Sequence, residues 1–260
     1  MSDSGATRVS VSGDGTEANG LSFLPAISAD SRFVAFDSRA TNLVAGDTNG
    51  RSDIFVRDRV AQDTIRVSVA TNDTQGNNDS IEPDLSNDGR FVVFRSRATN
   101  LVADDTNGWS DIFVHDRASA ETTRVSVASD GTQADGGSYF PVIAGNGRYV
   151  AFQSRASNLT TGQTGAPIGV FVHDRETGVT ADVAIRNDGT VSEVSAYLPA
   201  LDGAGRFVVF QSADDTLVDG DTNGVADIFL RDRVTNTTSR VSVASDGTGL
   251  AKGGQLPAIS

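Results

Sequence analysis

Apolar residues gather in short runs along the chain, separated by polar stretches rich in Gly, Asn and Asp. One stretch contains the runs LPAIS (24–28), RFVAFDS (32–38), DIFVRD (53–58) and TIRVSV (64–69). Their apolar residues are mainly β-branched or aromatic, and no run keeps apolar residues at helical spacing. A short polar turn between the first two runs is typical of a β-hairpin. The pattern predicts an all-β chain built from units of four strands.

The same pattern returns at intervals of 58 residues. The stretch DTNGRSDIFVRDR begins at Asp47, and close copies begin at Asp105 and Asp221. A divergent copy, QTGAPIGVFVHDR, begins at Gln163. Five of the six prolines keep this spacing: Pro25, Pro83, Pro141, Pro199 and Pro257. Four antiparallel strands in a repeat of this length are typical of β-propeller blades.

Two features of the repeat favour blades that pack side by side around a centre. The second run carries adjacent apolar residues (33–36), as expected for a strand covered on both faces. The recurring proline lacks an N–H and belongs on a sheet edge, which the innermost strand of a blade provides. A β-sandwich is the alternative, but it does not readily explain one proline in every unit. We expect a β-propeller of four-stranded antiparallel blades.

We expect one domain, 1–260, with four complete blades and extra terminal strands. The predicted repeats are 22–79, 80–137, 138–195 and 196–253, with partial strands at 7–12 and 255–260. These partial strands are of the fourth and first types, which are not neighbours in a blade. Three interpretations stay open: a segment of a longer array, a four-bladed ring with a redundant strand at each end, or a chain that offers its spare strands to other copies.

The order of motifs resembles a known family. The pattern P-[IL]-S-x-D-G-R-F-V-x-F, followed by D-I-F-V-x-D and then R-V-S, is similar to the TolB-type (WD-like) β-propeller repeat, and it covers essentially the whole chain. The long DTNG loop resembles the variant found in large secreted bacterial proteins. The resemblance implies a propeller in an extracellular or periplasmic setting. Related propellers serve as protein-binding platforms, scaffolds and accessory domains of enzymes.

Charge and composition exclude several classes of partner and of site. The formal net charge of −13 argues against nucleic acid, which needs a basic face. Apolar runs such as FVVF (91–94) are too short to span a membrane. The first ten residues lack the basic and apolar regions of a signal peptide, so we expect either a cytosolic protein or one whose leader has been removed. The chain has no Cys, so it has no disulfide, thiolate metal site or cysteine nucleophile.

The recurring loop carries the best candidate for a metal-binding site. Its Asp and Asn residues are closely spaced around a glycine, and calcium is bound by loops of this kind. The candidate calcium ligands are Asp47, Asn49, Asp53, Asp105, Asn107, Asp111, Asp221, Asn223 and Asp227. The alternative is that these side chains bond to the backbone and shape the entry into the strand. The third copy loses all three residues together, at Gln163, Gly165 and Gly169.

Other polar residues give weaker candidates. His115 and His173 stand 58 residues apart, so we expect a contact at the surface or between blades rather than catalysis. Three carboxylates fall near the inner strands, where glycoside-cleaving propellers carry their acids: Glu82, Asp84 and Asp202. Asp84 and Asp202 are not equivalent in the repeat, which weakens this case. Trp109 lies on a loop, where an exposed ring would contact a sugar or a protein, but we expect a ring packed against the loop.

We therefore expect a non-catalytic module for binding or scaffolding, with calcium in its loops and an unidentified protein or carbohydrate ligand. A self-assembling protein joined through its terminal strands is the alternative. An enzyme, or an accessory domain that acts on glycosides, comes third.

Overall fold

The computed structural model describes residues 5–161, 167–250, 253–254 and 256–259, and in these residues it contains strands and no helix. The first sheet holds β1 (Ser22–Ile27), β2 (Phe33–Ser38), β3 (Asp53–Asp58) and β4 (Asp63–Arg66). The second holds β5 (Ser80–Leu85), β6 (Phe91–Ser96), β7 (Asp111–Asp116) and β8 (Glu121–Arg124). The third holds β9 (Ser138–Ile143), β10 (Tyr149–Ser154), β11 (Gly169–Asp174) and β12 (Val179–Asp182). The fourth holds β13 (Ala196–Leu201), β14 (Phe207–Ser212), β15 (Asp227–Asp232) and β16 (Thr237–Arg240).

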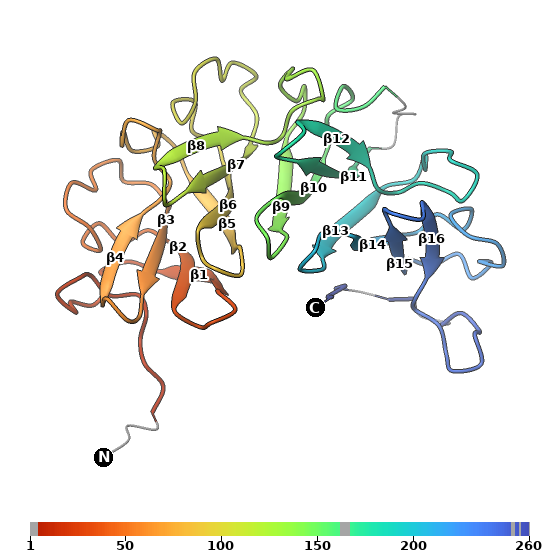
Figure 1. The fold of residues 1–260 in the computed structure, drawn as a ribbon, viewed down its shortest axis with the longest axis horizontal. Helices are drawn as coiled ribbons and strands as arrows, with labels where there is room; N and C mark the ends of the chain where they lie inside the picture. Colours follow the sequence, from red (N-terminus) through yellow and green to blue (C-terminus); the bar gives the residue numbers. More distant parts are fainter. Residues whose placement is uncertain (1–4, 162–166, 251–252, 255, 260) are drawn as a thin grey trace.

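Each sheet is an antiparallel meander in chain order, so every repeat folds into one blade. The four blades follow an arc around a common centre, with β1, β5, β9 and β13 innermost (Figure 1). The predicted all-β propeller of four-stranded blades is confirmed. The recurring proline lies on the innermost strand, at the sheet edge, where no ladder partner needs its missing N–H.

Apolar residues of neighbouring blades form shared cores. Ile54 and Val56 of the first blade pack with Val92, Phe94 and other residues of the second. Equivalent clusters join the second blade to the third and the third to the fourth. Each second strand is covered on both faces, which is why its apolar residues are adjacent in sequence rather than alternating.

A second contact between blades is built from arginine and aromatic rings. The guanidinium of Arg32 lies 4.7 Å from the centre of the Phe33 ring, and that of Arg117 in the next blade lies 4.2 Å from it. Arg32 also pairs with Asp58 at 2.7 Å, so each ring is held between two cations of which one is neutralised. The next two junctions repeat this stack at Phe91 and Tyr149.

The arc is open between β1 and the fourth blade (Figure 1). Ile27 on β1 is 56% exposed, whereas its equivalents Leu85 and Ile143 are each 6% exposed because a preceding blade covers them. At the other end Val241 is 45% exposed, and its equivalent Val67 is fully buried. The two end blades therefore present apolar surface that the inner blades bury.

The predicted partial strands do not form ladders in the described residues. In 7–12, only Val11 pairs, in an isolated bridge with Glu17, and 256–259 contain no strand. Residues 255 and 260 lie outside the described residues. The first segment instead bonds to the first blade, because its carbonyls at Val11 and Ser12 accept hydrogen bonds from Thr64 and Arg57. The described residues include no helix long and apolar enough to cross a membrane.

Candidate functional site

The innermost strands share an irregular feature, a β-bulge at the proline. On β1 the pairing with β2 shifts between Phe23 and Ala26, which leaves Leu24 and Pro25 outside the ladder. The residue before each of the five recurring prolines has a left-handed backbone: Leu24 (φ 46°), Glu82 (φ 59°), Phe140 (φ 49°), Leu198 (φ 52°) and Leu256 (φ 54°). Such conformations cost on the order of 1–3 kcal/mol each for residues other than glycine. They are found most often at active sites and ligand-binding sites.

These bulges surround a cavity of about 340 Å³ at the centre of the arc, here called the axial pocket. Its wall is formed by the five prolines, the five residues that precede them, and Val142. Large apolar side chains remain open to solvent there, since Leu24 is 54% and Phe140 45% exposed. The pocket is thus an apolar, strained and accessible feature at the point where the innermost strands converge.

Among the described residues of this wall, Glu82 is the single ionisable one. Its Oε2 accepts a hydrogen bond from the backbone N–H of Phe140 at 2.9 Å, and its Oε1 lies 3.4 Å from Nη1 of Arg95. The Arg95 guanidinium in turn lies 5.1 Å from the centre of the Tyr139 ring. Glu82 therefore ties the second blade to the third and places one carboxylate beside the pocket.

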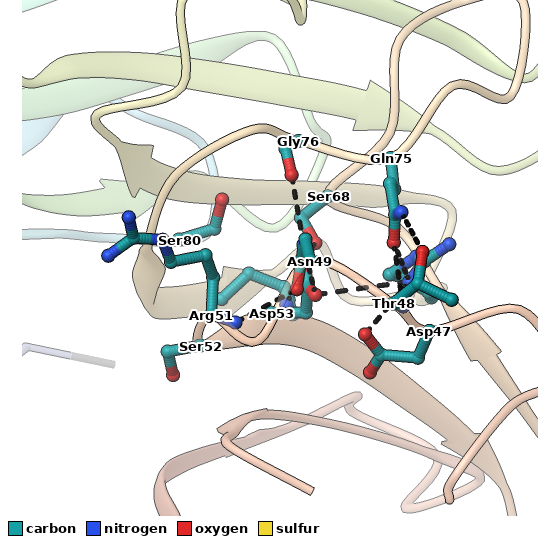
Figure 2. A network of polar contacts seen from close by, with 12 residues as sticks. Asp47, Thr48, Asn49, Arg51, Ser52, Asp53, Ser68, Gln75, Gly76 and Ser80 are labelled. Carbon is teal, nitrogen blue, oxygen red and sulfur yellow. Dashed lines mark hydrogen bonds and ion pairs between the residues drawn. The ribbon is translucent and has the colours of Figure 1, made fainter. Parts of the chain in front are cut away.

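The recurring loops are held by a polar network (Figure 2). The Asn49 amide donates to Asp53 Oδ2 at 2.8 Å and to the carbonyl of Gly76 at 2.9 Å, while its Oδ1 accepts from the backbone N–H of Arg51. The other oxygen of Asp53 accepts from Ser68 at 2.5 Å. The second and fourth blades repeat these contacts at Asn107 with Asp111 and at Asn223 with Asp227.

An arginine completes the network beside the predicted calcium ligands. Arg66 Nη1 lies 3.4 Å from Asp47 and 3.9 Å from Asp53, and its side chain is 11% exposed. Arg124 lies in the same way beside Asp105 and Asp111, and Arg240 beside Asp221 and Asp227. Burial raises the pKa of Asp47, and it raises that of Asp105 to about 6 together with the charge of Asp111.

This arrangement does not fit calcium as the side chains lie. Calcium needs six to eight oxygen ligands, but a guanidinium lies beside the two carboxylates and an amide N–H₂ faces one of them. The geometry favours the alternative interpretation, in which the loop side chains bond to the backbone and to each other. Among the described residues no group of three His, Cys, Asp or Glu is placed to hold a metal. Calcium binding stays a prediction.

Sequence reasoning missed the arginine, although the repeat carried its signal. Residues Gln163 and Gly165 of the third copy lie outside the described residues, and Gly169 begins β11. In that same copy the place of Arg66, Arg124 and Arg240 is taken by Asp182. Acids and arginine are lost together, as expected if they act as one ion-paired unit.

The remaining candidates have structural partners. Nδ1 of His115 lies 2.9 Å from Oγ1 of Thr122, and burial lowers the pKa of both histidines, that of His173 to about 4. Asp84 accepts a hydrogen bond from the backbone N–H of Ile143 in the next blade, and Asp202 accepts one from the backbone N–H of Phe207. Trp109 is 53% exposed on its loop. In the described part of the chain, no hydrogen bond or ion pair joins Glu82, Asp84 and Asp202 to one another.

Several solved structures share the architecture of this chain. TolB from Acinetobacter baumannii superposes with a TM-score of 0.50 at 14% identity, over 85% of this chain and 43% of that one. The fold is that of a TolB-like β-propeller. No protein-family model matches the chain, and no curated protein does.

The TolB-like propeller is also similar to parts of larger proteins. The tricorn protease matches at 11% identity with a TM-score of 0.52, over 88% of this chain and 24% of that one. A structure of prolyl endopeptidases matches at 14% identity with a TM-score of 0.55, over 92% and 31%. The chain thus spans less than half of each of these proteins. At such identities the likeness shows the fold alone.

Proposed function

We propose that this TolB-like propeller is a non-catalytic binding module whose axial pocket takes an apolar ligand. The observation that carries the proposal is the repeated left-handed residue before each proline, which turns large apolar side chains toward one cavity. Apolar residues exposed in a concave site gain more from a ligand than the same residues on a flat surface. An extracellular or periplasmic location, implied by the family resemblance, belongs to this proposal.

A neutral fluorescent probe, N-phenyl-1-naphthylamine, tests the pocket. We expect its fluorescence to rise on binding to the wild-type protein. Phe140→Ser and Leu198→Ser should each weaken binding several-fold, because each removes an apolar wall of the pocket. Val234→Ser serves as the control, since Val234 is 70% exposed on a turn at the outer side of the fourth blade. Equal binding by all four proteins would contradict the proposal.

A second candidate function is self-association through the end blades. It is supported by the exposed apolar residues there, Ile27 at one end and Val241 at the other, whose equivalents are buried between inner blades. Each end carries one half of an interface that occurs three times within the chain. A second copy could dock its first blade on the fourth blade in the same way, a head-to-tail contact.

A further inference from the structure

Three charged residues near the axial pocket, Glu82, Asp37 and Arg95, depart from the uncharged residues found at the same repeat positions in other blades. Glu82 stands where the other copies have Leu24, Phe140, Leu198 and Leu256. Arg95 stands where the others have Asp37, Gln153 and Gln211. Since uncharged residues serve at these positions in other blades, the fold of a blade does not require the charges. Departures from a repeat that gather at one site indicate a role beyond the repeat.

The position of Arg95 and Asp37 reaches the bulge of the following blade. In the third blade, Gln153 Oε1 accepts a hydrogen bond from the N–H of Leu198 at 3.1 Å, across the junction. Asp37 lies two and four residues beyond Ala35 and Phe33, which belong to the core shared with the second blade. Because side chains alternate along a strand, Asp37 lies on that same face. It therefore faces the second blade, which carries Glu82 on β5.

Asp37 is held there with little compensation for its charge. It is 3% exposed, its Oδ2 accepts one hydrogen bond from Ser52 at 3.3 Å, and its Oδ1 accepts none from the described residues. Burial raises the pKa of Asp37, and the nearby charge of Glu82 raises it further. A buried carboxylate without a cation or full hydrogen bonding is unfavourable. Two carboxylates thus lie near each other: Asp37 at the junction of the first and second blades, and Glu82 at that of the second and third, where Arg95 pairs with it.

We propose that the axial pocket binds apolar amines, such as peptides that begin with a large apolar residue and a free α-amino group. The inference rests on the proposed binding function of the same pocket. The ammonium group meets Glu82, the nearby Asp37 adds negative charge, and the apolar body packs against the wall formed by the bulge residues. When ionised, Glu82 and Asp37 carry two negative charges and Arg95 one positive charge, which leaves one negative charge for the ligand to neutralise. The volume of about 340 Å³ suits a ligand of one or two large side chains.

A matched pair of peptides tests this chemistry. The probes are phenylalanyl-leucinamide with a free amine and its N-acetyl derivative, measured by calorimetry at about pH 6.5, where the amine is charged. We expect the wild-type protein to bind the free amine at least tenfold more tightly. Glu82→Gln should abolish this preference while keeping an acceptor for the Phe140 N–H. Arg95→Gln, the residue of the third and fourth blades, should strengthen binding of the amine.

Two further variants separate charge from folding. Glu82→Leu restores the residue of three other copies and adds apolar surface to the wall, so it should bind N-phenyl-1-naphthylamine more tightly than the wild type and show no preference for the amine. Glu121→Gln removes a carboxylate from β8, the outermost strand of the second blade, and should keep the preference. Equal binding of the two peptides by the wild type, or a preference that survives in Glu82→Gln, would overturn the inference.

The same data distinguish this inference from the function on which it rests. Binding of the neutral dye without binding of either peptide would overturn the amine inference and leave the apolar pocket supported. Failure of the dye and of both peptides would overturn the two proposals together.

Discussion

At the scale of single residues, one arginine lies beside the carboxylates of each DTNG loop. Arg66 joins Asp47 to Asp53, and Asn49 directs its amide at the same carboxylate. A buried ion pair gains little over an apolar pair of the same shape, but removing one partner leaves a buried charge uncompensated. The network therefore fixes the geometry of the loop more than it raises the stability of the chain.

Replacing the arginine should expose this dependence. We expect Arg66→Met to lower the free energy of unfolding by about 3 kcal/mol, because it leaves buried carboxylates unpaired. Arg51→Met is the matched control, as Arg51 is exposed on the same loop and should change stability by less than about 0.5 kcal/mol. Urea denaturation followed by circular dichroism gives both values. Similar losses in the two variants would contradict the role of Arg66.

The pKa of Asp105 gives a pH test of the same network. Burial and the charge of Asp111 raise it from 3.8 to about 6, so between these values the folded protein holds a proton that the unfolded chain releases. The contribution of Asp105 to stability is full below the lower value and is lost as the pH rises through the upper one. We expect the wild type to lose stability relative to Asp105→Asn between about pH 4 and 7. A difference between the two proteins that stays constant over this range would contradict the raised pKa.

At the scale of elements, the hairpin turn of one blade is shaped to accept a ring of the blade before it. Gly89 lies in the turn between β5 and β6 with a φ of 67°, and a Cβ added there would lie 2.3 Å from the Phe33 ring. Gly147 and Gly205 face Phe91 and Tyr149 in the same way. Glycine is needed at these turns for both backbone conformation and space.

A pair of glycine substitutions separates these two effects. Gly89→Ala should lower stability through the left-handed backbone, about 1 kcal/mol, and through the clash with Phe33, a further 1–3 kcal/mol or so. Gly15→Ala has a similar φ of 87° with nothing within 4 Å, so it should show the backbone cost alone. Differential scanning calorimetry of both variants measures the difference. Equal shifts would mean that the turn does not support the ring.

The DTNG loop is the element on which the calcium prediction is tested. If the arginine network is the resident structure, neither millimolar calcium nor EDTA should shift the melting temperature. A rise with calcium and a fall with EDTA would show that Arg66 moves aside and would support calcium at Asp47, Asn49 and Asp53. Asp53→Asn should abolish such a rise at that loop.

At the scale of the whole molecule, the arc ends in two blades with exposed apolar residues, Ile27 and Val241, and the chain has a net charge of −13. The apolar ends favour association, while like charges oppose it until salt screens them. The balance between these forces sets the oligomeric state.

Sedimentation velocity should therefore show association that grows with protein and salt concentration. Ile27→Lys and Val241→Lys should each suppress it, because each places a charge in the end-to-end contact. Val60→Lys is the control, since Val60 is 73% exposed on the turn between β3 and β4. Monomers at every concentration would contradict association through the end blades.

The sequence by itself determined the blade. Its 58-residue period and strand-length apolar runs encode local pairing, and adjacent apolar residues such as Ala35 and Phe36 encode burial on both faces, because these depend on neighbours in the same repeat or the next one. The tertiary structure alone showed the pocket and the ion pairs. Arg66 is distant from Asp47 along the chain, so their contact could not be predicted from spacing. The left-handed residue Glu82 could be assigned to a pocket only because the structure places it beside four equivalent residues. Spacing along a chain specifies which strands pair, whereas the contents of a site depend on the directions in which side chains from several blades converge.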